Sequence, residues 1–209
     1  MMGDKNTADC PVCDDAAGIA SPEGNEDTSG WGGLEFLPGH PLMWVLILSE
    51  LVVFGAFLLV FSAVRIMDPA RFAADQLHLS PLAGGINTII LLSSGLSAVF
   101  AMRAMERKRI LSCRIWLGGT ALLGLVFLVV KLVEYGAKIN AGITIDTSTF
   151  FTLYFLITGF HALHVVMGLG ILCVVGMWPS RVNIETGTAF WHMVDLIWVL
   201  VFPVIYLVR

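Results

Sequence analysis

The sequence is short of charged residues. Asp, Glu, Lys and Arg make up 13% of its 209 residues, whereas hydrophobic residues make up 57%, and the mean hydropathy is +0.84. So few charges cannot cover the surface of a soluble globular protein of this length. The composition therefore excludes an ordinary soluble domain and predicts a membrane protein.

Cysteines are few as well. The four cysteines provide no disulfide framework. Cys10 and Cys13 form a CPVC motif, but a single CxxC supplies only half of the ligands of a closed zinc site. We interpret this motif as part of a flexible tail, with metal or redox use as the less favoured alternative. Cys113 and Cys173 are expected to pack among helices as small membrane residues.

Several functional motifs are missing. The chain contains no GxGxxG motif, no phosphate-binding loop and no internal repeat, and no nucleic-acid partner is expected. Secondary transporters usually carry inverted repeats or broken helices, so a transporter or proton channel is a weaker hypothesis here. The N-terminus lacks a basic segment followed by an apolar core, so we expect no cleaved signal peptide.

The sequence does contain five apolar runs. Each reaches roughly 20 residues, the length that an α-helix needs to cross about 30 Å of hydrocarbon. A backbone in lipid must satisfy its own hydrogen bonds, so each run is predicted to be a helix, and short connections favour antiparallel neighbours. The predicted fold is an all-α integral membrane bundle of five transmembrane helices. The runs cover residues 42–64, 83–103, 112–133, 150–178 and 189–208.

Acidic residues are concentrated before the first run. Residues 1–38 are predicted to be a flexible acidic tail with Lys5 as its only base, and residues 39–209 to be the transmembrane domain. With the N-terminus inside, seven of the Lys and Arg residues lie on the inner side and five on the outer side. The densest cluster, MRAMERKR, then lies inside. We therefore predict the N-terminus inside and the C-terminus outside.

Six ionisable residues lie in or at the end of these runs, where an unpaired ionisable group is costly. They are candidates for a role in proton transfer or in a lipid cleft, against the alternative of hydrogen-bonded structural groups. His161 and His164 share a helix face and can either hold haem or a metal or bond to neighbouring helices. His192 and Asp195 share another face. The six residues are Glu50, Glu134, His161, His164, His192 and Asp195.

Depth argues against a metal site built from three histidines. Counted along straight helices from the inner ends, His164 lies ~21 Å deep, whereas His192 lies only ~5 Å deep. We expect Glu50, His192 and Asp195 to form one polar cluster in the inner half of the membrane instead. No catalytic, cofactor-binding or metal-ligating residue is predicted.

Other polar residues are expected to shape the helices. Lys131 and Glu134 lie one turn apart and are expected to pair near a membrane surface. Thr147 or Ser148 can cap the fourth run, and Pro203 predicts a kink in the fifth. Small polar residues in the second run are predicted to mediate helix packing. They are Asn87, Thr88, Ser93 and Ser94.

Five motifs, in order over residues 40–207, resemble subunit III of the haem–copper oxidases, the cytochrome c oxidase subunit III-like proteins. They are WVLILSELVVFGAF, GGINTIILLSSG, KLVEY, GFHALHVVMGLG and FWHMVDLIWVLVFPVIYL. The chain resembles the five-helix form of this family. Within that form, it is most similar to members associated with nitric oxide reductase, through LPGHPLMW, TFFTLYFLITGFHALHVVMG and WHMVDLIWVLVFPVIYLVR.

The resemblance implies a subunit that has no redox cofactor of its own. Such a subunit packs against a haem-bearing catalytic subunit, which holds the haem with copper or iron, and it binds phospholipid in a cleft between helix groups. It supports proton uptake in a multi-pass protein of the bacterial inner (cytoplasmic) membrane. Glu50 matches the intramembrane carboxylate of the family, and Glu134 matches its Glu-Tyr residue. The other four ionisable residues match its polar helix-face positions.

We therefore predict a non-catalytic, accessory subunit of a respiratory haem–copper complex in electron transport. The resemblance favours a nitric oxide reductase partner, in denitrification, over a cytochrome c oxidase partner. One alternative is subunit III proper of a cytochrome c or quinol oxidase. An alternative of another class is an independent membrane cytochrome or a proton channel.

Overall fold

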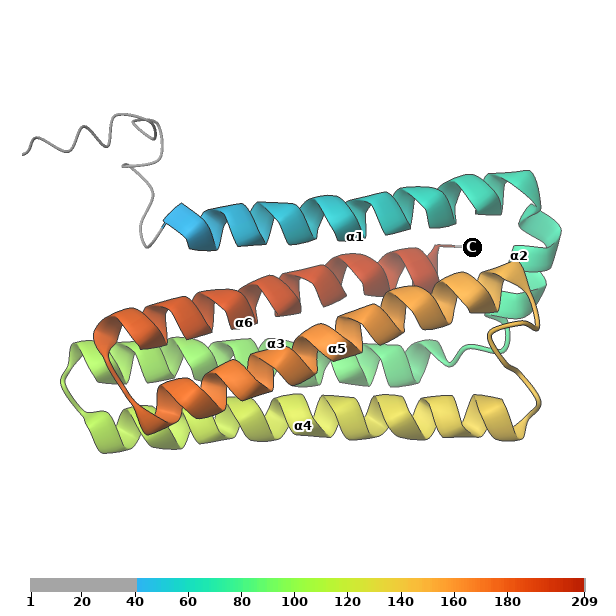
Figure 1. Cartoon of the computed structure of the whole chain (residues 1–209). Helices are drawn as coiled ribbons and strands as arrows, with labels where there is room; N and C mark the ends of the chain where they lie inside the picture. Colours follow the sequence, from blue (N-terminus) through green and yellow to red (C-terminus); the bar gives the residue numbers. More distant parts are fainter. Residues whose placement is uncertain (1–40, 209) are drawn as a thin grey trace, which may run out of the picture. The chain divides into compact units, whose positions relative to one another are not determined.

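The computed structural model describes residues 41–208, and this part of the chain folds into helices without any strand (Figure 1). Five of the helices are long and apolar enough to cross a membrane, as the sequence predicted. The acidic tail with Cys10 and Cys13 lies outside the described residues. The elements are α1 (Pro41–Met67), α2 (Pro69–Gln76), α3 (Pro81–Glu106), α4 (Ile110–Asn140), α5 (Thr149–Met177), α6 (Arg181–Phe202) and η1 (Pro203–Leu207).

The last long helix begins earlier than predicted. Its start is at Arg181 rather than at residue 189, and Ser180 caps it by accepting a hydrogen bond from the Asn183 backbone N–H at 3.1 Å. The first two turns are polar, so hydropathy alone does not detect them, although they are helical. His192 consequently lies about 16 Å along the helix axis from its start, not 5 Å.

A short helix, α2, was not predicted. The sequence contains a start signal for it, an Asp followed by a Pro. In the structure Asp68 is the N-cap and accepts a hydrogen bond from the Arg71 N–H at 3.3 Å, and Pro69 occupies the first turn. The buried amide of Gln76 donates to the backbone oxygens of Ile205 and Val208, each at 3.0 Å. The end of α2 is thereby tied to the end of the last helix.

Pro203 interrupts α6, as predicted. The chain continues as η1, a π-helical turn, in which the Val208 N–H donates to the Pro203 carbonyl at 2.9 Å. The missing N–H of proline forces this change in hydrogen-bonding pattern. The prediction that Ser148 caps a helix is also confirmed, because its hydroxyl accepts from the Phe151 N–H at 3.3 Å.

The centre of the bundle is the α6 side chain Trp191, which is fully buried. Gly124 on α4 and Gly168 on α5 make room for it, since a Cβ at Gly124 would lie 2.5 Å from the indole and one at Gly168 2.9 Å. By contrast, only 11% of the residues in the most apolar stretch of the α1 span are buried, against 56% in the span that α6 forms with η1. Helix α1 therefore lies at the edge of the bundle, and α5 runs obliquely to the other long helices (Figure 1).

Candidate functional site

The carboxylate of Glu134 is the centre of the largest polar network inside the bundle. Its Oε2 accepts from Lys131 Nζ at 3.0 Å, and its Oε1 accepts from Lys138 Nζ at 3.3 Å. The hydroxyls of Tyr154 and Tyr206 also donate to Oε1, each at 3.0 Å. We call these five residues the Glu134 network. It joins α4, α5 and η1.

Lys131 and Glu134 pair as predicted, but not at an exposed surface. Their side chains are 1% and 8% exposed. The Lys131 ammonium donates to Tyr206 at 2.7 Å and lies 4.8 Å from the centre of the Trp198 ring. Ion pairing together with cation–π contacts compensates the cost of burying this charge.

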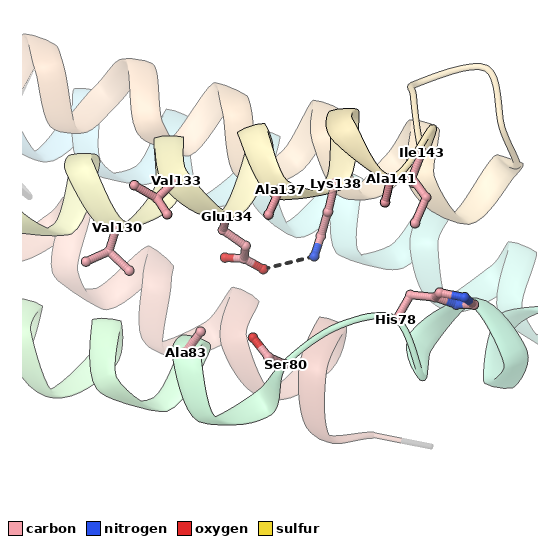
Figure 2. A pocket seen from close by; sticks show the side chains of 10 residues that line it. All are labelled: His78, Ser80, Ala83, Val130, Val133, Glu134, Ala137, Lys138, Ala141 and Ile143. Carbon is pink, nitrogen blue, oxygen red and sulfur yellow. Dashed lines mark hydrogen bonds and ion pairs between the residues drawn. The ribbon is translucent and has the colours of Figure 1, made fainter.

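A pocket of about 400 Å³ gives this network access to the surface. Glu134 and Lys138 point into it from α4, and Figure 2 shows Ser80 and Ala83 on its opposite side, with His78 at one end. The pocket thus brings one carboxylate and one ammonium together with His78 and Ser80 in a hollow whose other lining residues are apolar.

Glu50 on α1 lies against His164 on α5. Its Oε2 is 3.0 Å from His164 Nε2, although the two groups lack the alignment of a hydrogen bond. The other ring nitrogen, Nδ1, lies 2.8 Å from the carbonyl oxygen of Phe160, which can only accept, so Nδ1 carries a hydrogen. An attractive contact between Nε2 and Oε2 then requires one proton on either atom.

Glu50 therefore contacts His164 rather than the expected His192 and Asp195, which both lie beside Gly95 of α3. Depth counted along straight, parallel helices placed Glu50 and His164 at different levels. Helix α5 runs obliquely to the other long helices (Figure 1), and its His164 contacts Glu50 of α1. Side-chain convergence depends on helix tilt, which the sequence pattern does not contain.

His161 lies in an aromatic enclosure of its own. It is fully buried, with ring centroids 5.1 Å from Trp198 and 5.7 Å from Phe127. Neither of its ring nitrogens has a hydrogen-bond partner in the described chain. His161 and His164 both contact the ring of Phe54, at centroid distances of 6.2 Å and 5.5 Å, but of the two only His164 lies against a carboxylate. Within residues 41–208 no three His, Cys, Asp or Glu side chains come together as metal ligands.

Asp195 lies against α3, beside the glycine at position 95. Its carboxylate Oδ2 contacts the position that a Cβ of Gly95 would occupy, and Nδ1 of His192 lies 3.5 Å from that position. Asp195 is 6% exposed and its oxygens have no hydrogen-bond partner among the described residues, whereas His192 is exposed. Gly95 is thus the residue that admits this carboxylate, and it was not singled out from the sequence.

The small polar residues of α3 differ in their contacts. Thr88 accepts an indole N–H from α6 at 3.1 Å, and Ser94 donates to a backbone carbonyl of α4 at 2.9 Å. Asn87 is fully buried without a side-chain hydrogen bond in the described chain. Ser93 lies on the exposed face and bonds back to its own helix at 2.8 Å.

Three residues of the Glu134 network, Lys138, Tyr154 and Tyr206, were missed by the sequence reasoning. Tyr154 and Tyr206 are both buried, and their hydroxyls lie 3.2 Å apart. A tyrosine near the end of a membrane helix usually indicates an interfacial anchor. In the sequence, the only sign of a polar site here was the expected pairing of Lys131 with Glu134 on α4.

The sequence matches a known family over most of its length. Residues 39–208 match the family described as cytochrome c oxidase subunit III. The cytochrome c oxidase subunit 3 of Corynebacterium diphtheriae is 35% identical over 140 residues, which cover 63% of this chain and 68% of the relative. The same subunit of Synechocystis sp. is 31% identical over 184 residues, covering 81% and 77%.

A third relative contains two subunits in one polypeptide. The haem–copper oxidase subunit I+III of Aeropyrum pernix is 31% identical over 180 residues, which are 79% of this chain and 22% of that protein. The matched region of this relative is thus a small part of a fused chain.

Proposed function

This chain belongs to the cytochrome c oxidase subunit III family, and we propose that it is subunit III of an oxygen-reducing cytochrome c or quinol oxidase. Subunit III is a non-catalytic, multi-pass membrane subunit of haem–copper oxidases. The observation that carries the proposal is the family match over residues 39–208, which includes all five candidate spans. The relatives named above are oxidase subunits and favour this assignment over nitric oxide reductase, which only the motif resemblance suggested.

The partner in this proposal is the catalytic subunit. Subunit III associates with subunit I in haem–copper oxidases, and in the relative from Aeropyrum pernix both are one chain. We place the haem and the copper or iron in that partner and no cofactor in this chain. The contacts support this, because Glu50 and Glu134 bind side chains of their own bundle, and His161 packs among aromatic rings while His164 lies against Glu50.

The Glu50–His164 pair is the proposed contribution to proton uptake. It lies between α1, at the edge of the bundle, and α5, with Glu50 Oε2 and His164 Nε2 3.0 Å apart. A partner or a phospholipid covering α1 would enclose it.

We further propose that the N-terminus is inside a bacterial inner membrane. Lys131 and Lys138 are buried in the Glu134 network, so they do not count as loop charges. At the same end of the described bundle, only Arg65 and Arg71 remain. The other end carries Arg103, Arg107, Lys108, Arg109, Arg114 and Arg181. Leaving out the two buried lysines increases the excess of Lys and Arg at the end that we assign to the inner side, and this excess supports the proposed orientation.

Purification from native membranes tests the assignment. The chain, carrying an affinity tag, is expected to co-purify in mild detergent with a haem-containing subunit, and the complex is expected to consume oxygen. A tagged, unrelated multi-pass protein from the same membranes serves as the control. A complex that consumes nitric oxide and not oxygen would establish the reductase alternative. Recovery of the chain only as a homo-oligomer would overturn both assignments.

A further inference from the structure

A basic pocket lies at the turn between α3 and α4. It has a volume of about 240 Å³ and is lined by Arg103, Arg107 and Arg109 together with Ser112. None of the three arginines forms an ion pair within the described chain, and Glu106 on the same turn does not line the pocket. Three uncompensated positive charges therefore surround one hollow, which favours an anionic ligand.

An apolar groove of about 350 Å³ continues from this pocket along the same two helices. The two hollows share Phe100 and Trp116, whose ring centroids are 4.8 Å apart. Farther along, the groove is lined by Leu96, Ile115 and Leu122, which are 56%, 64% and 61% exposed on the outer surface of the bundle. A positively charged hollow thus opens into an apolar one on the outer surface of the described bundle.

We propose that these two hollows bind one anionic phospholipid. Its phosphate lies among the three arginines, since guanidinium groups bind phosphate oxygens through paired N–H donors. One acyl chain lies in the groove, and Trp116 occupies the interface between the two, where indole rings are favoured. Basic pockets between membrane helices suit such headgroups.

The apolar groove favours a lipid over a free phosphate ion. A free ion would use the arginines and leave the groove without a role, whereas a phospholipid fills both hollows. The site goes beyond the proposed function, because it needs only residues of α3 and α4. It is also separate from the Glu50–His164 pair, which lies between α1 and α5.

Native mass spectrometry of the purified complex tests the proposal. The complex is reconstituted in nanodiscs of phosphatidylcholine containing phosphatidylglycerol, and one phosphatidylglycerol is expected to stay bound to each chain. Replacing Arg103, Arg107 and Arg109 together by Gln is expected to weaken its retention on the order of a hundredfold. Haem content and elution volume of each variant verify that the complex is intact.

A second variant tests the groove without changing the charge. Ser93 is exposed and lines the groove, so Ser93→Trp is expected to displace the acyl chain and lose the lipid. Its control is Leu92→Trp, which places the same ring on the neighbouring exposed position outside the groove and is expected to keep the lipid.

The control for charge is Lys108→Asn. Lys108 lies in the same turn but does not line the pocket, and its φ of 56° is one that Asn tolerates. This variant is expected to retain the lipid. Equal loss in Lys108→Asn and in the arginine variant would overturn the proposal in favour of diffuse surface charge. Full retention in Ser93→Trp, or equal retention of phosphatidylcholine, would overturn it as well.

Discussion

Near the end of α4, one carboxylate compensates two buried ammonium groups. Glu134 accepts from Lys131, Lys138 and two tyrosine hydroxyls, so both of its carboxylate oxygens bind donors of the bundle. Removing one member of a buried ion pair leaves the other charge uncompensated, and this is more costly than the pair itself is stabilising. The residue is therefore expected to matter for the stability of the bundle.

Glu134→Gln keeps the size of the side chain and removes its charge. We expect the free energy of unfolding to fall by about 3–5 kcal/mol, because Lys131 and Lys138 then remain buried without a counter-charge. Unfolding of the purified chain by titration with SDS in bicelles measures the change. The control is Glu106→Gln on the exposed end of α3, which should leave the midpoint unchanged. Equal midpoints for both variants would show that the network does not stabilise the fold.

At the scale of the helices, α6 packs against its neighbours through one large side chain, Trp191, which lies between two glycines. The indole of Trp191 lies against Gly124 of α4 and Gly168 of α5, and its N–H donates to Ser94 of α3 at 3.0 Å. Three helices thus meet at one residue of a fourth. Close approach through small residues is the usual basis of helix packing in membranes.

Gly124→Ala is expected to disturb this contact. The new methyl group would lie 2.5 Å from the indole, so Trp191 has to move, at a cost of about 1–3 kcal/mol for overpacking. Gly118→Ala on the same helix is the control, since nothing lies within 4 Å of its Cβ position. The control should be neutral or slightly stabilising, because alanine favours helix over glycine. The same SDS titration distinguishes the two, and equal effects would contradict the fitted arrangement.

At the scale of the whole molecule, the sequence predicted more of the fold than of the site. Five spans follow from length and hydropathy, and all five are present. Hydropathy missed the polar start of α6 at Arg181 and the short α2, because both are helical without being apolar. The candidate residues were identified singly, but the pairing of Glu50 with His164 depends on helix tilt. The roles of Gly95 and Tyr206 depend on contacts between helices distant in sequence.

Orientation is a prediction at this scale. We expect alkaline phosphatase fused after Arg209 to be active and green fluorescent protein fused there to be dark, because the C-terminus should lie outside. Basic residues are concentrated at the opposite end, around Arg103, Arg107 and Arg109, and such residues remain on the cytoplasmic side. A fluorescent fusion with inactive phosphatase would reverse the topology.

The account depends most on the claim that the catalytic chemistry resides in a partner, while this chain engages its carboxylates Glu50 and Glu134 with basic side chains of its own bundle. Haem and metal content, measured on the purified complex and again on this chain after its separation from the catalytic subunit, tests that claim most directly. We expect all haem absorbance and metal to stay with the partner and the isolated chain to be colourless and metal-free. One haem or metal ion per isolated chain, lost on replacing His161 or His164 by Ala, would contradict the account.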